Sequence, residues 1–143
     1  MIEFVRAALI ANAASLGLHW IYDVKYLEEL SKKQSLLFLS QDKKHYDASH
    51  PSFYVYPENT VGDVSVQGDI LKWLYQALSE NPDFNQKQFS LLLFDKFRPG
   101  GAYSGYVEKY ANQHVFNVLS KKLQMPIETK PINDFQLVGF IPY

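Results

Sequence analysis

The chain of 143 residues contains no cysteine and has little excess charge of either sign. Without cysteine it can form no disulfide, offers no thiolate nucleophile and cannot bind zinc through sulfur. Its 14 basic and 15 acidic residues leave a net charge of −1, which gives no support to a nucleic-acid-binding protein or one that binds an anionic membrane. Because the absence of cysteine fits a reducing compartment, we expect a cytoplasmic protein.

Long uninterrupted hydrophobic runs are also missing. The apolar run at residues 7–18 contains Asn12 and Ser15, and it is shorter than the roughly 20 residues that a membrane-spanning helix needs. The opening residues, MIEFVR, show no basic leader of the kind that begins a secretory signal. We therefore expect neither a membrane span nor a cleaved signal peptide.

Apolar and aromatic side chains, in contrast, are abundant. Hydrophobic residues make up 47% of the chain, and ten Phe, ten Tyr and two Trp are present. Disordered chains are poor in aromatic residues, and this length is that of one ordinary domain. We therefore expect the chain to fold around a core.

Apolar residues recur at spacings of three and four in several segments, which is typical of amphipathic helices. Asp23 is placed to cap a short helix, Asn85 to start another, and Ser104 to open the last. The predicted helices cover residues 2–17, 23–30, 68–79, 85–97 and 104–123. Five helices without a convincing pair of strands predict an all-α fold, with a long irregular loop between residues 35 and 67.

The first predicted helix is rich in small residues. Its apolar stripe contains Val5, Leu9, Ala13 and Leu16, while alanines keep the rest of the helix slim. Small residues allow a neighbouring element to approach closely. We therefore expect this helix to be central and buried.

The densest group of chemically active side chains follows this helix in the sequence HWIYD, residues 19–23. An imidazole, an indole, a phenol and a carboxylate within five residues could line a cleft, which makes His19, Trp20 and Asp23 candidate substrate-binding residues. The alternative is structural: Trp20 and Tyr22 would cover the edge of the core, and His19 would interact with the dipole at the helix end.

A second group precedes the predicted helix at residues 68–79. Asp63, Ser65 and Asp69 offer the hard oxygen ligands that magnesium and calcium prefer. A loop that leads into a helix N-terminus also suits an anion. The alternative is that one of these residues simply caps the helix.

The polar stretch at residues 41–50 contains a third group. Asp42, His45, Asp47 and His50 could form a metal cluster, but no pattern of supporting residues accompanies them. We favour solvated loop residues here.

Four stretches resemble a known family. Residues 6–23, RAALIANAASLGLHWIYD, resemble the opening of the ADP-ribosyl-glycohydrolase family, and most closely its crystallin-like branch. Residues 62–71 resemble the glycine–aspartate stretch of that branch, and residues 105–108 its Gly-Tyr turn, with residues 134–142 in the place of the approach to the next helix.

This resemblance implies an all-α fold around a cleft that holds two magnesium ions. It also implies a hydrolase that cleaves the glycosidic bond between ADP-ribose and a protein side chain or a small acceptor. A metal pair of this type orients the ribose hydroxyls and activates water. Within it, we expect His19, Trp20 and Asp23 to contact the substrate and Asp63, Ser65 and Asp69 to bind Mg²⁺.

The chain departs from the family pattern at the first metal motif, which is Thr-Asp-Asp-Thr in the family. The corresponding residues here are 65–68, SVQG, so that Val66 and Gln67 replace both carboxylates. The second motif lies in the C-terminal half of family domains. We therefore expect residues 1–143 to form a single, incomplete domain that has no activity alone.

A non-catalytic structural or interaction protein of the crystallin-like branch is the alternative. Such a chain would expose apolar helix faces and self-associate. An unrelated small helical binding domain is a further alternative.

Overall fold

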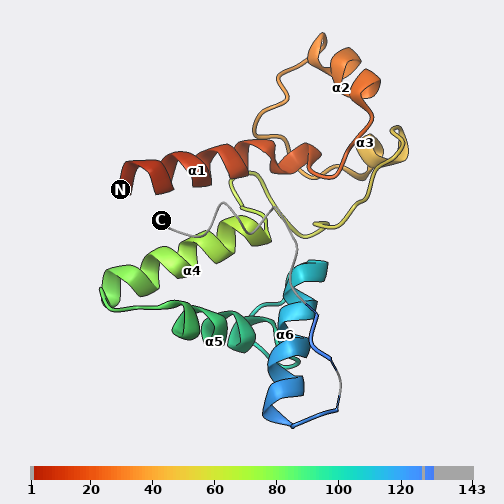
Figure 1. Ribbon diagram of the computed structural model, residues 1–143. Coiled ribbons are helices and arrows are strands. Elements are labelled where there is room, and N and C mark those ends of the chain that lie inside the picture. Colours follow the sequence, from red (N-terminus) through yellow and green to blue (C-terminus); the bar gives the residue numbers. More distant parts are fainter. Residues whose placement is uncertain (1, 127, 131–143) are drawn as a thin grey trace. The chain divides into compact units, whose positions relative to one another are not determined.

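The computed structural model describes residues 2–126 and 128–130 (Figure 1), and these form an all-α structure. The sole strand-like feature in this part of the chain is an isolated antiparallel bridge between Ile21 and Ser52. The all-α prediction is therefore confirmed. In chain order the elements are α1 (Ile2–Ser15), the 3₁₀ helix η1 (Leu16–Leu18), α2 (Val24–Ser31), α3 (Lys43–Asp47), α4 (Val66–Glu80), α5 (Gln86–Phe97) and α6 (Lys109–Lys122).

The chain divides into two compact units, Met1–Asp69 and Ile70–Tyr143, which are described separately. Helix α4 begins in the first unit and has most of its residues in the second. In the described ranges, no helix combines the length and the apolar character needed to cross a membrane. The sequence match at residues 134–142 lies outside the described residues.

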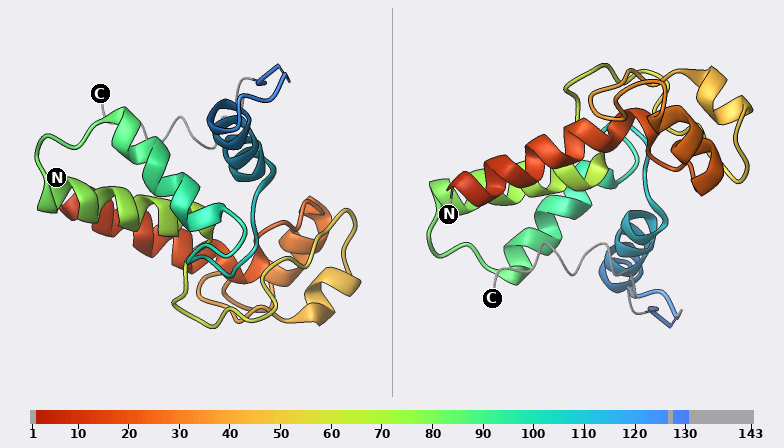
Figure 2. Two further views of the ribbon diagram at one scale, coloured as in Figure 1. Left: turned by 90° about the horizontal axis from the view of Figure 1, so that it is seen from below. Right: turned by 90° about the horizontal axis from the view of Figure 1, so that it is seen from above.

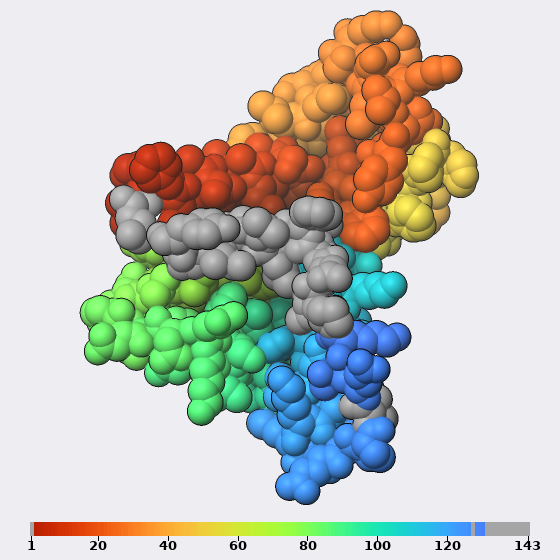
Figure 3. Space-filling view, viewed as in Figure 1, coloured from red at the N-terminus to blue at the C-terminus, as the bar shows by residue number. Residues whose placement is uncertain are grey.

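Helix α1 is buried only near its C-terminal end. Ala13, Ala14 and Leu16 are buried, whereas Phe4 is 82% exposed and Ile10 is also exposed. Figure 3 shows the first turns of α1, in red, at the molecular surface. The prediction of a central, buried helix is therefore wrong for most of its length. Small residues allow another element to pack closely against a helix, but they do not by themselves bring such an element to it.

The C-terminal end of α1 is held by the irregular segment that follows α2. The Phe38 amide donates to the Ala14 carbonyl at 2.8 Å, so the segment closes over the last turn of the helix. A side chain at Gly17 would collide with the backbone of Leu39. The predicted helix stop at Gly17 is thus also a point of close approach.

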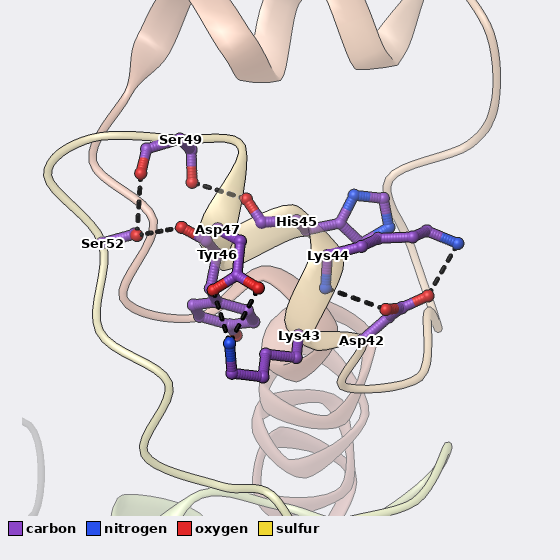
Figure 4. Close-up of polar contacts among 8 residues, drawn as sticks. All are labelled: Asp42, Lys43, Lys44, His45, Tyr46, Asp47, Ser49 and Ser52. Carbon is purple, nitrogen blue, oxygen red and sulfur yellow. Dashed lines mark hydrogen bonds and ion pairs between the residues drawn. The ribbon is translucent and has the colours of Figure 1, made fainter.

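The loop expected between residues 35 and 67 contains one short helix that the sequence pattern did not predict. Helix α3 has only five residues, and Asp42 caps it by accepting a hydrogen bond from the Lys44 amide at 3.0 Å. His45 and Tyr46 are buried, so this stretch is not simply a solvated loop (Figure 4). A single helical turn is too short to show the periodicity by which helices are recognised.

In the second unit, α4 and α5 are joined by a turn in which the chain reverses direction (Figure 2). Asn85 begins α5 as predicted, and it forms a reciprocal capping box with Gln88. Leu93, Phe94 and Phe97 are the buried residues of α5. Helix α6 packs against α5, and the His114 Nε2 atom lies 2.7 Å from the Ser90 carbonyl oxygen.

Helix α6 begins at Lys109 rather than at Ser104, so the predicted start is wrong by about one turn. The reason lies in Tyr103, whose ring centroid is 5.3 Å from that of Phe97 and 5.7 Å from that of Trp73. The Tyr103 amide also donates to the Lys96 carbonyl. These contacts tie the preceding residue to α5 and leave the chain around Ser104 irregular.

Candidate functional site

Residues 19–23 follow η1, begin with a turn at residues 19–20, and pair with residues 51–53. The Tyr22 amide donates to the Pro51 carbonyl and the Phe53 amide to the Trp20 carbonyl, each at 3.0 Å. Trp20 has a φ angle of 69°, a left-handed conformation that is rare for a large aromatic residue. Such backbone conformations cost of the order of 1–3 kcal/mol and are concentrated at functional sites.

The His19 ring lies between two other aromatic rings. Its centroid is 6.1 Å from that of Trp20 and 5.9 Å from that of Tyr56. Burial lowers the pKa of the His19 imidazole below its ordinary value of 6.5, because the low-polarity surroundings disfavour the charged form. At neutral pH, His19 is therefore a neutral imidazole that can accept a proton, which does not fit a cation that interacts with the helix dipole.

The Trp20 side chain is the centre of a small aromatic group. Its ring is in edge contact with Tyr22 and with Phe53, at centroid distances of 6.3 and 5.8 Å. Tyr22 is 58% exposed, so it does not cover the core as the structural interpretation of this segment expected. The group instead presents aromatic surface beside His19.

A buried tyrosine supports the backbone below His19. Tyr46 Oη lies 2.8 Å from both the His19 carbonyl oxygen and Gln41 Oε1, and the Gln41 amide nitrogen donates in turn to the Leu16 carbonyl. Burial raises the pKa of Tyr46 to about 12, so its hydroxyl remains a donor. Sequence reasoning missed Tyr46, because its neighbours in the chain are polar.

Asp23 is used as a structural anchor. Its Oδ1 atom accepts from the Tyr26 amide at 3.0 Å, which caps α2 as predicted, and its Oδ2 atom accepts from the His50 amide at 3.3 Å. These backbone hydrogen bonds lower the pKa of the Asp23 carboxyl. The carboxylate is therefore ionised at neutral pH and joins two segments, and its contact with a substrate stays a prediction.

The candidate metal ligands at residues 63–69 each lie in a different environment. Asp63 Oδ2 accepts from the amide and the hydroxyl of Thr60, at 2.7 and 3.0 Å. Ser65 is only 1% exposed, and Asp69 is half-buried in the first turn of α4. The structure thus fixes Asp63 and Ser65 within the loop that leads to α4.

Ser65 is held by the side chain of Asn12 in α1. The Asn12 amide nitrogen donates to Ser65 Oγ, and the Ser65 backbone amide donates to Asn12 Oδ1, both at 2.8 Å. The next residue, Val66, is fully buried and donates its amide to Tyr56 Oη at 3.3 Å. Asn12 is the partner that sequence reasoning did not find, since it lies 53 positions from Ser65.

The described residues around Ser65 include no cluster of carboxylates and imidazoles. Over residues 2–126 and 128–130, no group of three or more His, Asp or Glu residues is placed to hold a metal ion. The two residues after Ser65 are Val66, which is buried, and Gln67, and neither carries a carboxylate. Metal binding by Asp63, Ser65 and Asp69 stays a prediction.

The third candidate group is organised by α3. Asp42 caps the helix and pairs with Lys44 at 2.6 Å, while Asp47 pairs with Lys43 at 2.7 Å. His45 turns inward, and its Nδ1 atom lies 2.6 Å from Tyr26 Oη of α2. Asp42, His45 and Asp47 thus contact neighbouring protein groups, and Figure 4 shows the ion pairs of Asp42 and Asp47.

No family model, curated protein or solved structure matches this chain.

Proposed function

We propose that this chain is an ADP-ribosyl-glycohydrolase-like protein in which residues 19–23 contact an ADP-ribosyl group. The proposal depends on one observation above all. The segment that carries the resemblance is held in a strained conformation at Trp20, beside a neutral His19. Strain at a position that resembles a substrate-binding segment favours a functional reason for this backbone.

The chemistry of the segment is compatible with such a ligand. A neutral His19 ring nitrogen can accept a hydrogen bond from a ribose hydroxyl, and the aromatic surface of Trp20 offers an apolar face to a sugar or a base. Asp23 contributes by fixing the end of the segment through its bonds to Tyr26 and His50. We further propose that this chain binds without turnover, because Val66 and Gln67 supply no carboxylate.

Tryptophan fluorescence provides a direct test of binding. The chain has two tryptophans, and a Trp73→Phe variant leaves Trp20 as the only tryptophan. Titration with ADP-ribose should change the emission of this variant and leave that of the matched Trp20→Phe control unchanged. An unchanged Trp20 signal, together with no heat of binding in calorimetry, would overturn the proposal.

A His19→Phe variant, which keeps an aromatic ring but removes both ring nitrogens, tests the proposed hydrogen bond to the ligand. Loss of one such bond is worth about 1.4 kcal/mol, or a tenfold weaker affinity. A release assay on ADP-ribosylated substrates with added magnesium tests the proposal that the chain binds without turnover. We expect no turnover, and measurable release of ADP-ribose would contradict the absence of activity.

The exposed apolar residues of α1 favour a second candidate, a non-catalytic interaction protein. Ile2, Phe4 and Ile10 all lie on this helix and are more than half exposed. Apolar groups at such exposure favour association. Sedimentation of the wild-type chain and of a Phe4→Ser variant tests it: self-association that Phe4→Ser weakens supports this candidate, and a wild-type monomer excludes self-association.

A further inference from the structure

A phenol and an imidazole from two separate helices form a short hydrogen bond in the first unit. Tyr26 belongs to the first turn of α2 and His45 to α3, and Tyr26 Oη lies 2.6 Å from His45 Nδ1. The two rings meet edge to face at a centroid distance of 6.1 Å. His45 is 7% exposed, whereas Tyr26 is half-buried. The base is therefore enclosed, and the phenol remains partly accessible.

A charged pair lies beside this hydrogen bond. The Lys44 ammonium is 2.6 Å from Asp42 Oδ2, and this hydrogen bond raises the pKa of Lys44, with a smaller contribution from Tyr26. Lys44 is therefore a stable cation whose charge acts on the phenol oxygen. A cation at this position stabilises negative charge that develops nearby during a reaction. Figure 4 shows Lys44 and His45 on α3 and Asp42 at its N-cap.

This arrangement has the parts of an activated nucleophile. A hydroxyl becomes nucleophilic when an adjacent base within hydrogen-bonding distance takes its proton. With the ring proton on Nε2, His45 Nδ1 is that base for Tyr26. We propose that Tyr26 and His45 form a nucleophile–base pair that accepts an acyl group from a carboxylic ester.

The transfer balances without a further reactant. Tyr26 Oη forms a bond to the ester carbonyl carbon while its proton passes to His45 Nδ1. The bond from this carbon to the leaving oxygen then breaks, and the leaving alcohol takes the proton from His45. Lys44 offers its positive charge to the oxyanion of the tetrahedral intermediate. The products are an O-acyl Tyr26 and an alcohol, and water releases the acid from the tyrosyl ester.

Acetylation by p-nitrophenyl acetate tests this pair on the full chain. Peptide mapping by mass spectrometry follows the rate of acetylation of each tyrosine. Tyr22 is the matched reference, because it lies four residues away and is more than half exposed. General-base assistance is worth roughly 100-fold, so Tyr26 should react about that much faster than Tyr22. Equal rates, or a faster Tyr22, would overturn the proposal.

The base is tested with a His45→Gln variant. We expect its Tyr26 rate to fall by about 100-fold, while the Tyr22 rate in the same sample is unchanged. A Tyr26 rate that His45→Gln does not alter would show that the imidazole takes no part. If circular dichroism shows that this variant does not fold, the ratio of the two rates in the wild-type chain decides the question.

Discussion

Two groups of side chains, one in each compact unit, make different kinds of contact. In the first unit, buried hydroxyl and imidazole groups take part in specific hydrogen bonds, as Tyr46, His45 and Ser65 show. In the second unit, the rings of Trp73 and Phe97 pack against each other. A hydrogen bond depends on particular atoms, whereas ring packing depends on volume. Single-atom changes should therefore damage the first unit, and loss of volume the second.

The largest expected effect is that of Phe97→Ala in the second unit. Phe97 is buried and its ring contacts Trp73 and Tyr103, so truncation should lower the free energy of unfolding by about 4 kcal/mol. Urea unfolding followed by Trp73 emission in a Trp20→Phe background measures this. Phe116→Ala, at a more exposed position of α6, is the control and should cost much less. Similar losses for both variants would contradict volume dependence.

Asn12→Ala should have the next largest effect, in the first unit. The change removes both hydrogen bonds to Ser65 and leaves its buried amide and hydroxyl without these partners. We expect a loss of about 3 kcal/mol, measured by Trp20 emission in a Trp73→Phe background. Asn112→Ala, at an exposed position, should stay within about 0.5 kcal/mol of the parent. A loss below about 1 kcal/mol for Asn12→Ala would contradict the expectation that the stability of the first unit depends on particular hydrogen-bonding atoms.

Tyr46→Phe sharpens the comparison because it deletes a single oxygen and keeps the ring. The hydroxyl supports the carbonyl of His19 and the side chain of Gln41, so its removal should cost about 1.5 kcal/mol. Tyr22→Phe, which removes an exposed hydroxyl, should cost less than about 0.5 kcal/mol. Thermal unfolding of the two variants measures the difference in their stability. Equal melting temperatures would argue against a contribution from the Tyr46 hydroxyl.

The smallest effect concerns pH and His19. Burial lowers the pKa of this imidazole in the folded chain below the value of 6.5 of the unfolded chain. The unfolded chain therefore binds more protons as the pH falls below about 6.5, and the free energy of unfolding decreases. The stability that His19 contributes in its neutral form is fully present above about pH 6.5. A His19→Gln variant should lose that part of the pH dependence in parallel urea titrations, and identical pH profiles would count against a buried neutral His19.

Local signals in the sequence predicted the parts of the fold that depend on neighbouring residues. The cap at Asp23 and the start of α5 at Asn85 follow from side chains that bond amides two or three positions ahead. The same kind of signal failed at Ser104. There the Tyr103 ring packs on α4 and α5 residues, and no local pattern contains that contact.

The sequence places the candidate site residues next to one another but does not reveal their partners, and substrate contact by these residues stays a prediction. His19, Trp20 and Asp23 lie together at the end of η1, as their adjacency in the chain requires. Their supports are distant in sequence: Tyr46 bonds the His19 carbonyl from 27 positions away. Likewise, the burial of His45 depends on α2, so a polar stretch of sequence could not reveal it.

The bond between Asn12 and Ser65 also bears on the order in which the chain folds. It spans 53 positions, and a loop of that length must close before the bond can form. Helices such as α2, whose cap is local, need no such closure. We therefore expect the start of α4 to dock on α1 late, with a φ-value near zero for Asn12→Ala. In that case the Asn12–Ser65 pair would mainly set the rate at which the folded chain unfolds. An Asn12→Ala variant that chiefly slows folding would instead show that the pair forms early.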